Sequence, residues 1–164
     1  NLYLPKEIKQ GEKLPLVYFG VDMSGNNDDL TTPLYQGNGA TVWTDPAFQA
    51  KHPSIVVAPQ YTSELVTKLG MLTADDHHWT KGLTLLKHFL DYAVKTYPVD
   101  PNRIYGTGQS QGGMANIAIS DRYPDFLRPS ILWPANGIPR KCRSSRISPF
   151  GSPSVKGIIK PTPQ

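Results

Sequence analysis

The residues best suited to chemistry lie in the pentapeptide Gly108-Gln109-Ser110-Gln111-Gly112, in which one serine stands between two glycines. This G-x-S-x-G spacing is typical of a nucleophile elbow, a sharp strand-to-helix turn that lifts a serine hydroxyl out of a sheet. A Cβ at either glycine would collide with the neighbouring backbone of such a strained turn. The spacing therefore predicts that Ser110 is an accessible nucleophile, able to attack a carbonyl carbon.

The segments on either side of this motif have the order that such a turn requires. Residues 82–95 place apolar side chains at helical spacing, and the proline-bearing residues 97–102 then end the helix. Residues 103–107 are predicted to form a strand, and residues 113–122 a second helix. Helix, strand, turn and helix in this order favour a functional serine over a serine in a chance loop.

Two further buried strands are predicted before the motif. Residues 14–21 are rich in β-branched and aromatic side chains and lead into the polar loop 22–27, and residues 54–58 form a second apolar run. Strands that alternate with helices predict an α/β domain with a mostly parallel sheet and helices on both faces. Ligands bind at the carboxyl edge of such a sheet, where we expect both Ser110 and the loop 22–27.

The net charge of +4 is divided unevenly along the 164-residue chain. Residues 1–126 carry 10 Lys and Arg against 13 Asp and Glu, whereas residues 127–164 carry 7 Lys and Arg and no acid. The second segment also holds 7 of the 16 prolines and lacks sustained periodicity, which is typical of an irregular basic extension. Because it has neither interleaved aromatic side chains nor a folded motif, no nucleic-acid partner is predicted.

Length and composition exclude several other classes of protein. One domain is predicted over residues 1–126, and no apolar run approaches the length that crosses a membrane, so no membrane partner is predicted. Cys142 is the only cysteine, which excludes an internal disulfide framework and a cysteine-based zinc site. The sequence does not fix the oligomeric state or the compartment, although a secreted or periplasmic location is favoured over a cytoplasmic one.

Residues 1 to about 126 resemble the α/β-hydrolase superfamily, in particular the polyhydroxybutyrate-depolymerase-like esterases and predicted peptidases. The resemblance rests on six segments, residues 3–6, 14–21, 39–43, 55–61, 100–105 and 107–113. It implies a partial α/β-hydrolase fold. It also implies that the enzyme hydrolyses a carboxylic ester, in a small molecule or a polymer, through an acyl-enzyme on Ser110. It also implies an oxyanion hole formed by the backbone N–H groups of Gln111 and Met23, in a loop that reads Val21-Asp22 where the family has His-Gly.

A serine nucleophile of this fold needs a carboxylate and a histidine base, which follow it in that chain order. All four histidines precede Ser110, and the only acids after it, Asp121 and Asp125, lie on or just after the following helix. The chain is therefore predicted to hold the nucleophile without its activating partners. Three interpretations stay open: a serine esterase, a serine peptidase of the same fold, or a non-catalytic remnant.

The candidate pocket residues are Trp43, Tyr61, His78 and Trp79, although buried aromatic side chains are at least as often part of a core. His78 also ends a run of two acids and two histidines, residues 75–78. Adjacent side chains rarely converge on one ion, so this run does not predict a metal site. Neither a metal ion nor an organic cofactor is predicted.

The basic segment after residue 126 has a possible origin in a changed reading frame. When its residues are back-translated and read from the third base of each codon, residues 149–164 become compatible with Leu-Trp-Val-Thr-Val-Cys-Glu-Gly-Asp-Asn-Lys-Ala-Tyr-Pro-Ala. That string resembles the family's next core strand and its acid-bearing loop. We therefore expect the C-terminal part to be truncated and out of frame, and the alternative is a natural basic tail.

DNA sequencing across the codons for residues 125–128 tests this hypothesis. We expect a change of frame there, because one shift explains the missing acids, the proline content and the lost periodicity together. An uninterrupted frame in source DNA would contradict it.

Overall fold

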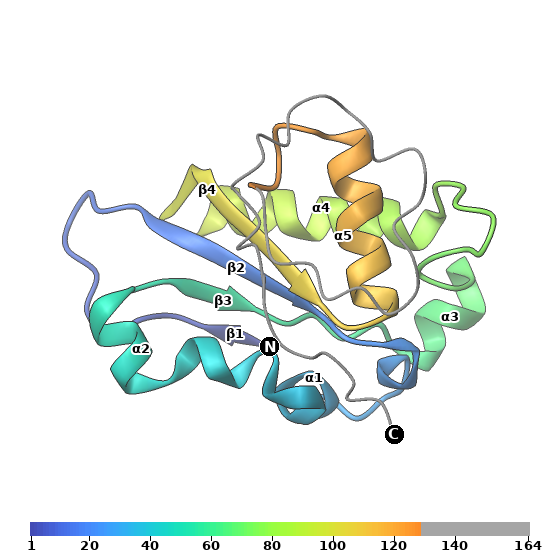
Figure 1. Ribbon diagram of the computed structural model, residues 1–164, viewed down its shortest axis with the longest axis horizontal. Coiled ribbons are helices and arrows are strands. Elements are labelled where there is room, and N and C mark those ends of the chain that lie inside the picture. The colour runs from blue at the N-terminus through green and yellow to red at the C-terminus, as the bar shows by residue number, and fades with distance from the viewer. Residues whose placement is uncertain (129–164) are drawn as a thin grey trace, which may run out of the picture.

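The computed structural model describes residues 1–128 (Figure 1). Residues 129–164, which include nearly all of the predicted basic tail and Cys142, lie outside the described residues. The first two residues of the predicted tail, Leu127 and Arg128, are described and pack against the domain. Leu127 is 5% exposed, and the Arg128 backbone N–H donates to the Ile104 carbonyl at 2.8 Å. The packed part of the chain thus continues two residues past the predicted boundary at 126.

In the described part of the chain, four strands form one sheet: β1 (Leu2–Tyr3), β2 (Leu14–Gly20), β3 (Ile55–Val57) and β4 (Val99–Gly108). Their spatial order is β1-β3-β2-β4. Strand β1 is antiparallel to β3, whereas β2 is parallel to both β3 and β4. The prediction of an α/β fold with a mostly parallel sheet is confirmed.

Five helices accompany the sheet within residues 1–128: α1 (Thr32–Tyr35), α2 (Pro46–Lys51), α3 (Ser63–Leu69), α4 (Lys81–Thr96) and α5 (Gln111–Arg122). Three short 3-10 turns join them: η1 (Met23–Gly25), η2 (Gln36–Asn38) and η3 (Thr41–Thr44). The start of α4 shows why the helices begin where they do, because the Thr80 hydroxyl accepts the otherwise unpaired Leu83 N–H at 3.0 Å. None of these helices has the length and apolar character that a membrane crossing requires.

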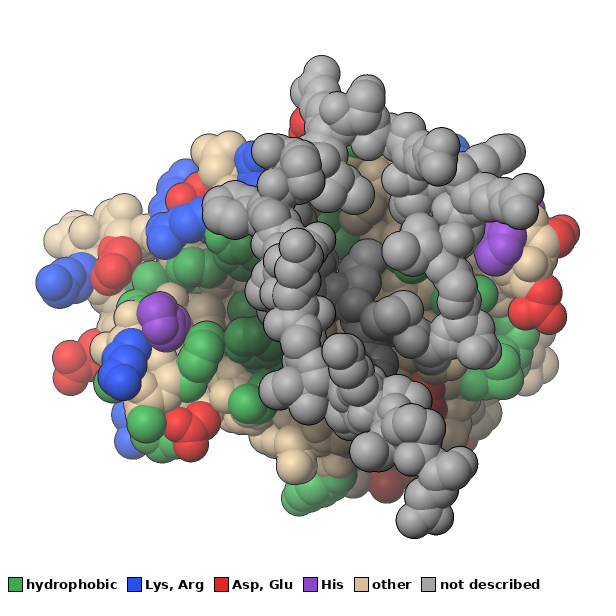
Figure 2. Space-filling view, in the orientation of Figure 1, with side chains coloured by type: hydrophobic (Ala, Val, Ile, Leu, Met, Phe, Trp, Pro, Cys, Tyr) green, Lys and Arg blue, Asp and Glu red, His purple; other side chains and the backbone are tan. Residues whose placement is uncertain are grey.

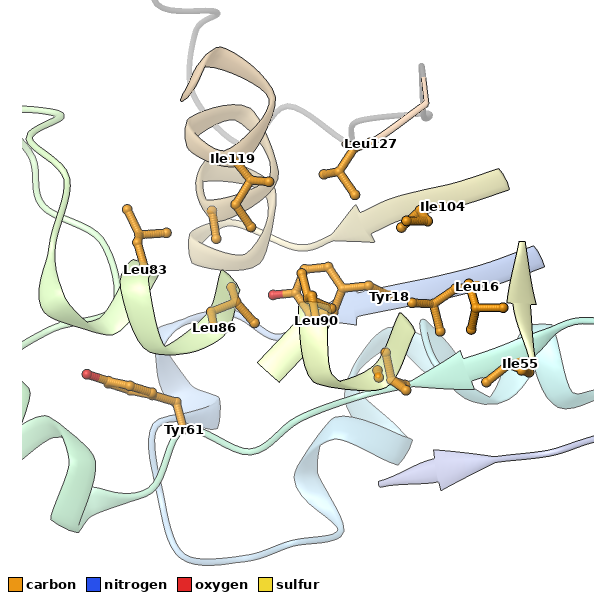
Figure 3. Close-up of a cluster of buried hydrophobic side chains, with 14 of the residues drawn as sticks. Leu16, Tyr18, Ile55, Tyr61, Leu83, Leu86, Leu90, Ile104, Ile119 and Leu127 are labelled. Carbon is orange, nitrogen blue, oxygen red and sulfur yellow. The ribbon is translucent and has the colours of Figure 1, made fainter. Parts of the chain in front are cut away.

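The side chains of β2 alternate between two hydrophobic clusters, as the pleat of a strand requires. Leu16 and Tyr18 belong to the larger cluster, which α4 and α5 complete with Leu83, Leu86, Leu90, Ala115 and Ile119 (Figure 3). Phe19 belongs to the smaller cluster, with Val21, Ala40 and Ala58. In Figure 1 the sheet lies between α4 and α5 on one side and α1 and α2 on the other. Both faces of the central strand are therefore covered.

Strand β4 begins earlier than the sequence predicted. Val99 already pairs with Leu14, although the prolines nearby predicted a loop over residues 97–102. The ladder is irregular here, because the one residue between Leu14 and Leu16 of β2 stands opposite the four residues between Val99 and Ile104 of β4. The extra residues form a bulge in which proline is tolerated, and this is why a turn-like sequence lies inside a strand.

Replacement of Leu90 by alanine should lower the free energy of unfolding by about 2–5 kcal/mol, because it removes a fully buried side chain (0% exposed) from the larger cluster. Leu85 of the same helix is 39% exposed, so Leu85→Ala should cost less than about 1 kcal/mol. Urea unfolding followed by circular dichroism measures both values. Equal losses in the two variants would contradict the orientation of α4.

Candidate functional site

Ser110 lies on the turn that joins β4 to α5. Its backbone has φ 49° and ψ −111°, a left-handed φ that costs a residue with a side chain on the order of 1–3 kcal/mol. Two backbone hydrogen bonds hold the turn: Gln109 donates to the Gly20 carbonyl at 3.0 Å, and Gly112 donates to the Gln109 carbonyl at 2.9 Å. The Ser110 side chain makes no capping bond to α5, so among residues 1–128 its hydroxyl is left without a hydrogen-bond partner.

Three glycines allow β2, β4 and α5 to approach one another at this turn. A Cβ on Gly112 would lie 2.1 Å from the Gly20 carbonyl oxygen, and a Cβ on Gly108 would lie 2.7 Å from the same atom. A Cβ on Gly20 would lie 2.7 Å from the Gly112 Cα. Carbon atoms do not approach backbone so closely, so each position admits only glycine. The collision predicted for Gly108 and Gly112 is present, and Gly20 is a third member that the pentapeptide does not contain.

The two backbone groups predicted to form an oxyanion hole follow neighbouring strands. Gln111 is the first residue of α5, and Met23 is the first residue of η1, just after β2. The strand ends meet, because Gly20 pairs with Gly108. Within residues 1–128 no backbone hydrogen bond uses the N–H of Gln111 or Met23. Within that range both N–H groups are thus free to donate to a ligand, and their role in an oxyanion hole stays a prediction.

The known proteins to which this chain is similar include three esterases. An acetylxylan esterase from Coprinopsis cinerea is 30% identical over 74 residues, which are 44% of this chain and 19% of that protein. A solved thermostable esterase is 28% identical with a TM-score of 0.68, over 79% of this chain and 35% of the esterase. A solved ferulic acid esterase is 20% identical with a TM-score of 0.57, over 79% of this chain and 51% of that one. No family model matches the chain.

The chain has an α/β-hydrolase-type fold. The thermostable esterase supports this by structure and by sequence, whereas the ferulic acid esterase supports the fold alone. The chain spans 19% of the length of the acetylxylan esterase and 35% of the thermostable esterase, so it corresponds to part of each. All three similar proteins are named as esterases.

In this α/β-hydrolase fold the loop after β2 is fixed by the side chain of Asp22. Its carboxylate accepts hydrogen bonds from the Ser24 backbone N–H at 2.8 Å and from the Ser24 hydroxyl at 2.6 Å. Partial burial alone would raise the pKa of Asp22, but the hydrogen bonds around it, from Ser24 first and then with Gln36 and the Gly25 backbone, together hold the pKa below its ordinary value. The sequence did not single out this loop as ordered. The Asp-x-Ser pattern, which is typical of an Asx turn, is the signal that could have done so.

No histidine of the described residues forms a hydrogen bond with Ser110. The His78 ring pairs with the Asp76 carboxylate, and both side chains are exposed. Two hydrogen bonds to His78 lower the pKa of Asp76, and the bond from the His78 backbone N–H has a larger effect than the bond from its ring. Asp121 is exposed on α5, 11 residues after Ser110, which places it about 16 Å along the helix. Within residues 1–128, neither a histidine base nor a carboxylate thus forms a hydrogen bond with the serine.

The predicted pocket residues lie in two regions. Trp43 packs edge-on against Phe48, with 5.3 Å between the ring centroids. Tyr61 is buried in the larger cluster, and its hydroxyl donates to the Gly70 carbonyl at 2.8 Å. His78 and Trp79 line an open hollow of about 590 Å³ between α3 and α4. Packing accounts for Trp43 and Tyr61, and a pocket role for any of the four stays a prediction.

Residues 75–78, which the sequence marked as a run of acids and histidines, form an exposed loop. Figure 2 shows histidine and acidic side chains on the surface in this region. In the part of the chain that the structure describes, no group of three or more His, Cys, Asp and Glu side chains is placed to hold a metal ion.

Gly112→Ala should destabilise the hydrolase domain by about 1–3 kcal/mol, because the added Cβ meets the Gly20 carbonyl and β2 cannot move away without breaking its ladder. Ser120→Ala, in the same helix, is the control and should change stability by less than about 0.5 kcal/mol. Urea unfolding measures both, and a Gly112→Ala variant as stable as the control would show that the elbow is looser than described.

Proposed function

We propose that the chain is the nucleophile-bearing part of a serine esterase that hydrolyses carboxylic esters through an acyl-enzyme on Ser110. The serine oxygen attacks the ester carbonyl carbon while its proton passes to a base, and the carbonyl oxygen becomes an oxyanion. When the carbonyl forms again, the bond to the alcohol breaks and the alcohol leaves with a proton, and water then releases the acid from Ser110. The backbone N–H groups of Gln111 and Met23 donate to that oxyanion, and each such donor is worth about 3 kcal/mol in the transition state. The substrate is an ester of a small molecule or of a polymer.

The observation that carries this proposal is the backbone of Ser110. A serine held at φ 49° between β4 and α5 costs free energy, and the packing of Gly20, Gly108 and Gly112 enforces it. A structural serine would not need this conformation. The turn leaves the hydroxyl uncapped and sets the Gln111 N–H beside it at the positive end of α5, which is the arrangement that acyl transfer uses.

Two esterase relatives support the ester over the amide substrate. The thermostable esterase is 28% identical over most of this chain, and the acetylxylan esterase 30% identical over part of it. A serine peptidase would use the same residues, and turnover of matched ester and amide substrates separates the two activities.

A non-catalytic remnant is the second candidate, and one observation favours it. Within residues 1–128 no histidine or carboxylate forms a hydrogen bond with Ser110, and loss of both partners removes most of the rate enhancement of a triad. What then remains is a residual effect of roughly 10³–10⁴ over water.

Labelling with a fluorophosphonate probe distinguishes these candidates. We expect one probe per chain on Ser110, identified by mass spectrometry of the peptide that contains it, and no labelling of Ser110→Ala. Ser120→Ala, another serine of the same segment, should label as the native chain does. No labelling of the native chain would reject the esterase and favour the remnant.

A further inference from the structure

One side-chain hydrogen bond joins the two loops that carry the proposed site. The Gln109 amide nitrogen Nε2 donates to Asp22 Oδ2 at 3.3 Å, across 87 positions of the sequence. Gln109 directly precedes Ser110, and Asp22 directly precedes Met23. The bond therefore connects the elbow, which carries Ser110 and the Gln111 N–H, to the loop that carries the Met23 N–H.

The Asp22 carboxylate also sets the direction of the Met23 N–H. Its Oδ1 accepts from the Ser24 N–H at 2.8 Å, which closes a ring around the Met23 peptide groups. The Ser24 hydroxyl donates to the same oxygen at 2.6 Å. A ring closed in this way prevents the peptide group between Asp22 and Met23 from rotating freely.

A third segment supports this arrangement. The Gln36 side chain, at the start of η2, accepts the Asp22 N–H at 2.7 Å and donates to the Ser24 hydroxyl at 3.1 Å. Next to it, Gly37 leaves space for the Gln109 side chain, because a Cβ there would lie 3.3 Å from Gln109 Oε1. The loop after β2 is thus held from both sides.

We propose that Asp22 is a positioning residue that couples the loop after β2 to the elbow, so that the N–H groups of Met23 and Gln111 converge on one oxyanion. This inference rests on the proposed function, which assigns the two donors. Asp22 acts through the peptide groups that it orients and does not contact the substrate. Donors on both carboxylate oxygens compensate its charge, which would otherwise oppose a developing oxyanion.

Exchange of the two side chains tests the coupling. Gln109→Glu sets a second carboxylate against Asp22, and the rate of fluorophosphonate labelling at Ser110 should fall about tenfold or more. Addition of Asp22→Asn restores an amide and a carboxylate in reversed order and should recover most of that rate. A double variant that labels no faster than Gln109→Glu alone would overturn the proposal.

Asp29 provides a matched control in the same loop region. Its Oδ1 accepts from the Thr31 N–H at 2.9 Å and from the Thr31 hydroxyl at 2.6 Å, which is the local pattern of Asp22 without a contact to the elbow. Asp29→Ala should change the labelling rate less than about twofold, and Asp22→Ala should lower it about tenfold or more. Equal effects of the two substitutions would reduce Asp22 to an ordinary loop residue.

Amide hydrogen exchange tests the contact independently of Ser110 reactivity. In Gln109→Glu the Ser24 amide, which donates to Asp22, should exchange several times faster than in the native chain, and the double variant should reverse this. If exchange responds in this way and the native chain is not labelled, the proposed function fails and the coupling of the loops stands. If exchange is the same in all variants, the coupling itself is wrong.

Discussion

The first turn of α5 packs closely against the ends of β2 and β4, which lie side by side. A Cβ added to Gly112 would lie only 2.1 Å from the Gly20 carbonyl oxygen. This close packing of three elements holds the turn at Ser110 in a left-handed conformation that the residue would not adopt alone. The direction of the Ser110 hydroxyl and the position of the Gln111 N–H both follow from it. The chemistry of the site therefore depends on backbone contact between elements that are distant in sequence.

The larger hydrophobic cluster supplies the rigidity that this turn requires. Leu83, Leu86 and Leu90 project from one face of α4 onto Tyr18 and its neighbours in the sheet, and Ile119 extends the same cluster from α5 (Figure 3). Burial of this apolar surface fixes α4 and α5 against β2 and β4. Because α5 cannot move away from the sheet, the strain at its first turn is maintained.

Polar side chains perform the corresponding task on the loop after β2. This loop has a single buried residue in its 3-10 turn, Gly25, and so has little apolar surface with which to fix itself. Asp22 instead accepts hydrogen bonds from Ser24 and Gln109, and its own backbone N–H donates to the Gln36 side chain. An ionised carboxylate suits this position, because a charged acceptor forms stronger hydrogen bonds than a neutral one. The site thus combines a turn fixed by packing with a loop fixed by charge.

The sequence by itself determined the fold class, the helix and strand order around Ser110 and the glycines of the elbow, because these depend on local periodicity and on steric limits within a few residues. It did not indicate that β4 begins at Val99, since proline is tolerated in a strand only at its start, on a sheet edge or in a bulge, and the partner strand decides which of these applies. The tertiary structure alone decided that Tyr61 is in the core, that Gly20 is part of the elbow and that Asp22 meets Gln109. Each of these is a contact between segments far apart in the chain, and no periodicity within one segment records which other segment will lie against it.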